Sequence, residues 1–193
     1  MNETSRRARN AERLAELNSV YASRIGRIIS QLEAGGFRPR IQDAWRSPES
    51  QLAAFEAGTS RLTFGFHNLT TDDGRPDSLA VDLLDDDNPL APRTNYLLRL
   101  AAAAGTVQCR TGIAWGLPQR LRVAVEEAVA TGNWNASVKV GWDPTHVEPV
   151  DVTLAEARAG KRPSSAVRRR AAARERARAG QRATRRRRRR VVG

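Results

Sequence analysis

Cysteine is almost absent from this chain of 193 residues, which has only Cys109. A single thiol excludes an intramolecular disulfide and a thiolate zinc cluster. Histidine is nearly as scarce, with only His67 and His146. A metal centre in this chain would therefore take its ligands from two imidazoles and from carboxylates.

Long apolar runs are also missing. No stretch of 18 or more apolar residues occurs, so the sequence predicts no membrane span. Residues 1–13 are polar and charged and lack the apolar segment of a secretory signal peptide. We expect the protein to be made in the cytoplasm, and another route must deliver it if its substrate lies outside.

The net charge of +12 is unevenly distributed along the chain. Residues 158–193 hold 16 Lys or Arg and one acidic residue, a net charge of +15. Residues 1–157 hold 17 Lys or Arg and 20 Asp or Glu, a net charge of −3. This contrast predicts one mildly acidic domain over residues 1–157, followed by an Arg/Ala-rich cationic tail over 158–193 that is disordered or conditionally helical.

The hydrophobic pattern predicts an α+β fold, with a small antiparallel sheet and flanking helices over about residues 5–155. The predicted helices cover residues 5–34, 48–56, 95–104 and 117–131, and the predicted strands cover 38–45, 78–84, 138–140 and 147–152. Residues 68–77 are rich in Thr, Asp, Gly and Pro, which indicates an exposed loop. The acidic run 85–87 is interpreted as a solvated loop rather than a second metal site.

Both histidines lie near carboxylates in the sequence. His67, Asp82 and His146 can supply three ligands to a zinc ion, the number typical of a catalytic site with one position left for water. Asp143 lies three residues before His146, where it can accept a proton from that water. Glu148 follows His146 by two residues and could orient it. The alternative is that both histidines are incidental surface or core residues.

Four motifs follow one another between about residues 10 and 150. They are Trp45-Arg46-Ser47-Pro48 with Gln51, His67 with Ser78-Leu79-Ala80-Val81-Asp82, Trp115-Gly116, and Asp143-Pro144-Thr145-His146-Val147-Glu148. In this order they resemble the zinc D-alanyl-D-alanine carboxypeptidase and L-alanyl-D-glutamate endopeptidase family, which includes many phage endolysins. The resemblance implies the fold of the hedgehog and DD-peptidase domains.

The resemblance also implies roles for individual residues. The zinc ligands would be His67, Asp82 and His146. Asp143 would be the general base and then the acid to the leaving amine. Arg46 would bind and polarise the scissile carbonyl or a substrate carboxylate, although it could instead form an ion pair with Asp43 or Glu49. Trp115 would shape the peptide pocket, although a buried tryptophan more commonly belongs to the core.

The chain departs from the family pattern at three places. His67 and Asp82 are fifteen residues apart, farther than in the commonest form, and the extra residues fall in the loop 68–77. Gly65 stands where the family has a serine, and Leu117-Pro118 follows Trp115-Gly116 where the family continues Gly-x-Trp. None of these departures removes a ligand or the base.

The sequence therefore predicts a zinc-dependent peptidoglycan peptidase that acts on the stem peptide in the cell wall. An L-Ala–D-Glu endopeptidase is favoured over a D-Ala–D-Ala carboxypeptidase, as a monomeric, bacteriolytic enzyme of the phage type. The competing hypothesis is a non-catalytic, zinc-stabilised module whose tail binds nucleic acid or anionic membrane.

The cationic tail is the second functional feature. Its charge suits an anionic envelope polymer or lipid, and nucleic acid remains open as a partner. No aromatic residue interrupts residues 158–193, which argues against base stacking. The tail could also be solvated and dispensable.

Overall fold

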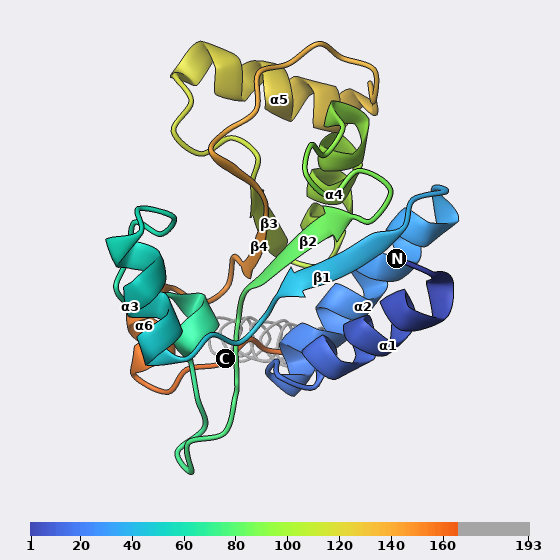
Figure 1. Cartoon of the computed structure of the whole chain (residues 1–193). Coiled ribbons are helices and arrows are strands. Elements are labelled where there is room, and N and C mark those ends of the chain that lie inside the picture. The colour runs from blue at the N-terminus through green and yellow to red at the C-terminus, as the bar shows by residue number, and fades with distance from the viewer. Residues whose placement is uncertain (166–193) are drawn as a thin grey trace, which may run out of the picture. The chain divides into compact units, whose positions relative to one another are not determined.

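A four-stranded antiparallel sheet flanked by helices forms the body of the molecule (Figure 1). The computed structural model describes residues 1–165, within which Met1–Arg162 form one unit. In these residues the helices are α1 Glu3–Leu14, α2 Ser19–Ala34, α3 Pro48–Glu56, α4 Thr94–Thr106, α5 Gln119–Thr131 and α6 Leu154–Arg158, and the strands are β1 Pro39–Asp43, β2 Val81–Asp85, β3 Cys109–Gly112 and β4 Asp143–Pro149. The predicted α+β class is confirmed. Residues 166–193 of the predicted cationic tail lie outside the described residues.

The strand order is β1-β2-β4-β3, so β2 and β4 form the centre of the sheet. Val81 and Leu83 of β2 are buried in the hydrophobic core, and Asp82 between them points to the opposite face. Helices α2 and α4 pack against each other on the core face. Their buried Tyr21 and Tyr96 donate hydrogen bonds to strand carbonyls of Val147 and Leu83, at 2.6 and 2.9 Å. The opposite face is thus left for the polar side chain of Asp82.

The single helix predicted over residues 5–34 is wrong, because the chain forms α1 and α2 with a break between them. Asn18 caps α2, since its side chain accepts hydrogen bonds from the amides of Val20 and Tyr21. The backbone at the break also bonds the segment that leads into β2: the Ser78 amide donates to Glu16 O, and the Asn18 amide donates to Ser78 O, both at 3.1 Å. The apolar pattern runs across the break because both helices face the core.

Residues 138–149 also differ from expectation. The predicted strand 138–140 is wrong, because these residues form no strand. The predicted strand 147–152 overlaps the end of β4, Asp143–Pro149, which begins earlier and contains His146. The register between β3 and β4 shifts between Thr111 and Gly112, whose partners are Val147 and Asp143. Pro144 falls in this irregular stretch, where a missing backbone N–H is tolerated.

The predicted strand 38–45 and the predicted helix 48–56 are confirmed as β1 and α3, and the Ser47 side chain caps α3. The loop 68–77 is exposed over its tip, as predicted. The acidic run 85–87 is not a solvated loop: Asp85 and Asp86 are buried, and Asp86 accepts a hydrogen bond from Arg40 Nε at 2.8 Å. The described residues contain no helix that is both long and apolar enough to cross a membrane.

Candidate metal centre

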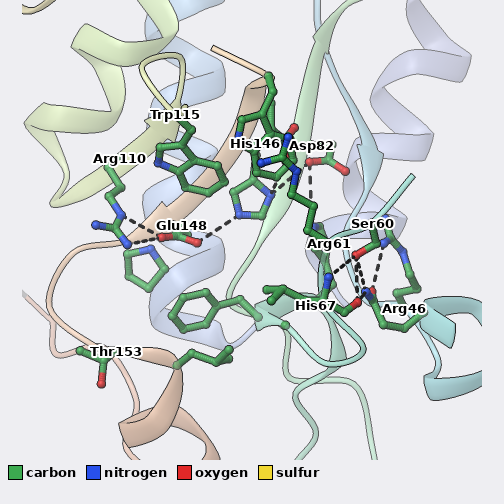
Figure 2. A pocket seen from close by; sticks show the side chains of 18 of the residues that line it. Arg46, Ser60, Arg61, His67, Asp82, Arg110, Trp115, His146, Glu148 and Thr153 are labelled. Carbon is green, nitrogen blue, oxygen red and sulfur yellow. Dashed lines mark hydrogen bonds and ion pairs between the residues drawn. The ribbon is translucent and has the colours of Figure 1, made fainter. Parts of the chain in front are cut away.

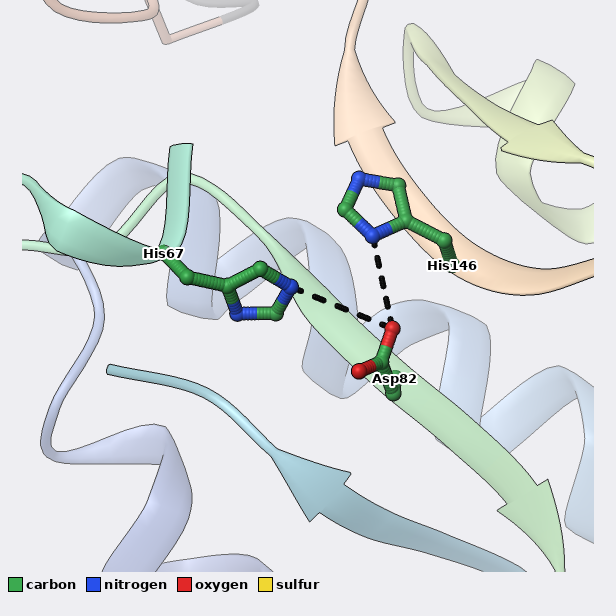
Figure 3. A group of neighbouring side chains, drawn as sticks. All are labelled: His67, Asp82 and His146. Atoms are coloured by element: carbon green, nitrogen blue, oxygen red, sulfur yellow. Dashed lines mark ion pairs between the residues drawn. The ribbon is translucent and has the colours of Figure 1, made fainter. Parts of the chain in front are cut away.

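Three side chains converge on one point above the sheet (Figure 3). The pairing of β2 with β4 places Asp82 directly opposite His146. His67 comes from the 3₁₀ turn Phe66–Asn68. His146 Nδ1 lies 3.3 Å and His67 Nε2 lies 3.9 Å from Asp82 Oδ1, and the three atoms lie within 4.8 Å of one another. The structure therefore brings the three predicted metal ligands together despite the long intervening loop.

The donor set suits a divalent cation. Asp82 Oδ1 is buried and accepts no hydrogen bond, although two imidazole nitrogens face it. A buried oxygen of this kind destabilises the fold unless a partner compensates for its lost hydration. One cation among the three atoms would satisfy the carboxylate and both imidazoles. Two nitrogens and one carboxylate oxygen are ligands that zinc accepts in catalytic sites.

Both imidazoles are held by a second partner, which fixes the nitrogen that faces the site. His67 Nδ1 bonds the carbonyl oxygen of Ala44, which can only accept, so the ring proton lies on Nδ1 and Nε2 keeps its lone pair. His146 Nε2 lies 3.2 Å from Glu148 Oε2, which leaves Nδ1 toward Asp82. Glu148 is bonded in turn by Arg110 Nε at 2.8 Å. This arrangement is typical of metal-binding histidines.

The protonation of the site reflects its buried charges. Burial lowers the pKa of His67 and outweighs the opposing effect of Asp82. Burial would also lower the pKa of His146, but Asp82 and Glu148 together raise it to about 10. In the absence of a cation, His146 is therefore protonated at neutral pH and compensates for part of the Asp82 charge. Metal binding must displace this proton.

Asp143 occupies the first position of β4, beside the three candidate ligands. Its Oδ2 lies 3.9 Å from His146 Nδ1. Burial and the nearby charge of Asp82 raise the pKa of Asp143. The predicted base thus lies near the point where a metal ion would bind, without being needed as one of the three ligands.

Arg46 lines the same pocket, but its guanidinium already has protein partners (Figure 2). Its Nε donates to Asp43 Oδ2 at 2.9 Å, and its Nη1 donates to Gln51 Oε1 at 3.1 Å. A third N–H, on Nη2, is directed at Asp43. The ion pair with Asp43, one of the two alternatives predicted for Arg46, is therefore present. A guanidinium has five N–H groups, so two remain for a substrate.

The ligands open into a pocket of about 710 Å³ (Figure 2). The partly exposed ring of Trp115 lies 5.2 Å from the ring of His146, centroid to centroid, and 5.6 Å from that of Trp142. Trp115 is therefore a pocket residue rather than a core residue. Helices α3 and α6 contribute Gln51 and Leu154 to the lining.

Three further lining residues, Arg61, Arg110 and Trp142, escaped the sequence analysis. Trp142 directly precedes the predicted base Asp143, and this adjacency could have identified Trp142 as a candidate pocket residue. Arg110 reaches the site only because β3 pairs with β4 opposite Glu148, which requires knowledge of the register. Arg61 lies in a segment without periodicity, and no pattern in the sequence marks it.

Comparisons with known proteins add little to this geometry. No protein-family model matches the sequence, and no curated protein matches it significantly. Among solved structures, the chain is similar to the L-Ala D-Glu endopeptidase ChiX of Serratia marcescens, with 16% sequence identity and a TM-score of 0.47. The match covers 74% of this chain and 87% of the other. A likeness this slight carries no argument about function. The function must therefore be argued from the residues of the site.

Proposed function

We propose that this protein is a zinc-dependent peptidase that hydrolyses a bond in the stem peptide of peptidoglycan. The observation that carries the proposal is the convergence of His67 Nε2, Asp82 Oδ1 and His146 Nδ1 in a large pocket, with Asp143 beside them. An L-Ala–D-Glu bond is favoured ahead of D-Ala–D-Ala, and the sequence motifs are shared by enzymes that cleave either bond.

The three converging residues would hold the metal ion. A zinc ion bound there supplies Lewis acidity, which lowers the pKa of a water molecule and polarises a peptide carbonyl. Ala44 and Glu148 keep both imidazoles in the orientation that this binding needs. Three protein ligands are the usual number in a catalytic zinc site, whereas structural sites commonly have four.

Asp143 moves the proton in this proposal. It takes a proton from the attacking water and later gives it to the departing amine. The position of Asp143 suits this double role, because its Oδ2 lies 3.9 Å from His146 Nδ1, beside the three candidate ligands. Arg46 orients the substrate carbonyl or a carboxylate with the N–H groups that Asp43 and Gln51 leave free.

The cationic tail, residues 158–193, has a separate role in this proposal. Its charge of +15 holds the enzyme on an anionic polymer or lipid of the cell envelope, near the peptidoglycan. Removal of residues 166–193 is expected to weaken sedimentation with whole walls at low salt and to spare hydrolysis of small soluble muropeptides. Equal binding of the truncated protein to walls would contradict this role.

Digestion of purified peptidoglycan tests the enzymatic proposal. Zinc-loaded protein is expected to release fragments whose masses identify the bond: new amino-terminal glutamate for the endopeptidase, or free alanine for the carboxypeptidase. The zinc-loaded variant Asp143→Asn is the matched control. If the wild-type protein binds zinc in the pocket and yields neither product, the proposal is wrong.

A further inference from the structure

Three arginines line the pocket, and they differ in their partners. Arg46 is bonded to Asp43 and Gln51, and Arg110 donates to Glu148 Oε1 through Nε and Nη2 at 2.8 and 2.5 Å. Within residues 1–165, Arg61 has neither a hydrogen bond nor an ion pair. Its guanidinium lies over the indole of Trp142, with Cζ 4.5 Å from the ring centroid.

The tryptophan under Arg61 is held in place by close backbone packing. The Gly141 amide donates to Ile113 O at 2.6 Å, and a Cβ at Gly141 would lie only 2.5 Å from Trp115 O. Gly116 has a φ of +74°, and a Cβ there would lie 3.0 Å from Cδ1 of Trp142. Both positions thus require glycine, which fixes the backbone that carries Trp142 against the turn at Trp115.

A guanidinium stacked on an aromatic ring keeps its N–H edge free for hydrogen bonding. That edge matches the two oxygens of a carboxylate. Arg61 and Trp142 line the same pocket as the three candidate ligands and Asp143. An anion bound by Arg61 would therefore belong to a substrate residue near the scissile bond.

We propose that Arg61, supported by Trp142, is a specificity subsite for a substrate carboxylate near the scissile bond. This inference rests on the proposed function. A glutamyl residue that gives its nitrogen to the scissile bond has two carboxyl groups, of which only one continues the chain. The other is a free carboxylate or a carboxamide, and Arg61 distinguishes between them because only the carboxylate forms a charge-assisted pair.

Two stem peptides that differ only in this group test the subsite. Wild-type protein is expected to hydrolyse the carboxylate peptide with a kcat/KM about 10- to 100-fold higher than the carboxamide peptide, mainly through a lower KM. Arg61→Gln removes the difference and leaves the carboxamide peptide unaffected, whereas Arg61→Lys keeps part of it. Arg27→Gln, which removes the same charge from an exposed position outside the pocket, keeps the full difference.

Binding separates this subsite from the enzymatic proposal. In the zinc-loaded Asp143→Asn background, calorimetry with both peptides is expected to show the same preference for the carboxylate and its loss on adding Arg61→Gln. The subsite would be overturned if the Asp143→Asn variant bound the two peptides with equal affinity. It would also be overturned if adding Arg61→Gln left the ratio of the two affinities unchanged. A preference that depends on Arg61, without any cleavage by the wild-type protein, would sink the proposed function and leave the subsite standing.

Discussion

Acidic side chains lie at both ends of strand β2, but their surroundings differ. Just beyond one end, Asp86 accepts a hydrogen bond from Arg40 at 2.8 Å and lies 3.3 Å from Arg38 Nη2 and from the amino terminus. At the other end, Asp82 faces two imidazoles, which are cations only when protonated. Asp86 is therefore paired with arginines, whereas Asp82 belongs to a group of three side chains that could hold a metal ion.

The largest expected difference between the two ends of β2 is in zinc binding, when one negative charge is removed at each end. Asp82→Asn is expected to abolish zinc binding, because it removes a ligand and leaves His146 without its main acidic partner. The loss should exceed the roughly 10- to 100-fold that follows removal of a residue that only orients a ligand. Asp86→Asn, the matched control, should keep wild-type zinc affinity in calorimetry. A similar loss in both variants would remove the distinction between the two ends.

A substitution at Asp143 is expected to affect catalysis rather than zinc binding. Asp143→Asn is expected to keep zinc but to lower kcat about 10²- to 10⁴-fold, the usual contribution of a general acid–base. Burial and the charge of Asp82 raise the pKa of Asp143 in the metal-free protein, so a bound cation should lower it again. Carboxyl NMR titrations with and without zinc measure this change. Undiminished turnover in the variant would exclude Asp143 as the base.

At the end of β2 near Asp86, a substitution is expected to change only the stability of the fold. Asp86→Ala leaves Arg40 partly buried without its carboxylate, which should lower the free energy of unfolding by about 3 kcal/mol. Urea denaturation of the metal-free protein measures this loss. Asp87→Ala is the control, because the side chain of Asp87 is 44% exposed and should contribute little. An equal loss for both would mean that burial of Asp86 is not the cause.

The smallest expected effect concerns the residue that orients His146. Glu148→Gln should weaken zinc binding about 10- to 100-fold, because the amide cannot provide the same charged partner for the ring. Competition with a chelator of known affinity measures the change. Arg110→Gln, which leaves the carboxylate in place, should weaken binding less. The reverse order would show that Arg110, not Glu148, controls the orientation.

The sequence predicted which residues could hold a metal ion better than it predicted the path of the chain. Two histidines in a chain with one cysteine limited the ligand choices, and the motif around His146 located the candidate base. The periodic apolar residues predicted helix over residues 5–34, but could not show that Asn18 would cap a second helix once Ser78 packed beside it. That contact joins segments sixty residues apart, so no local pattern contains it.

The same limit explains the remaining errors. Pro144 suggested a turn at His146, and only the irregular register with β3 accommodates it within a strand. Three consecutive aspartates suggested solvent exposure, but Asp86 is paired with Arg40 of the neighbouring strand β1 and with Arg38, which precedes that strand. No local pattern in the sequence identified Arg61 as a pocket residue, because its contact is with a tryptophan 81 residues later in the chain.

Zinc-edge anomalous diffraction from crystals of the zinc-loaded protein tests the central claim most directly. The expected result is one strong peak bounded by His67 Nε2, Asp82 Oδ1 and His146 Nδ1, at about 2.0–2.2 Å from each atom. A peak beside Asp85 and Asp86, or no peak in the pocket at saturating zinc, would contradict the assignment of this site as a catalytic metal centre.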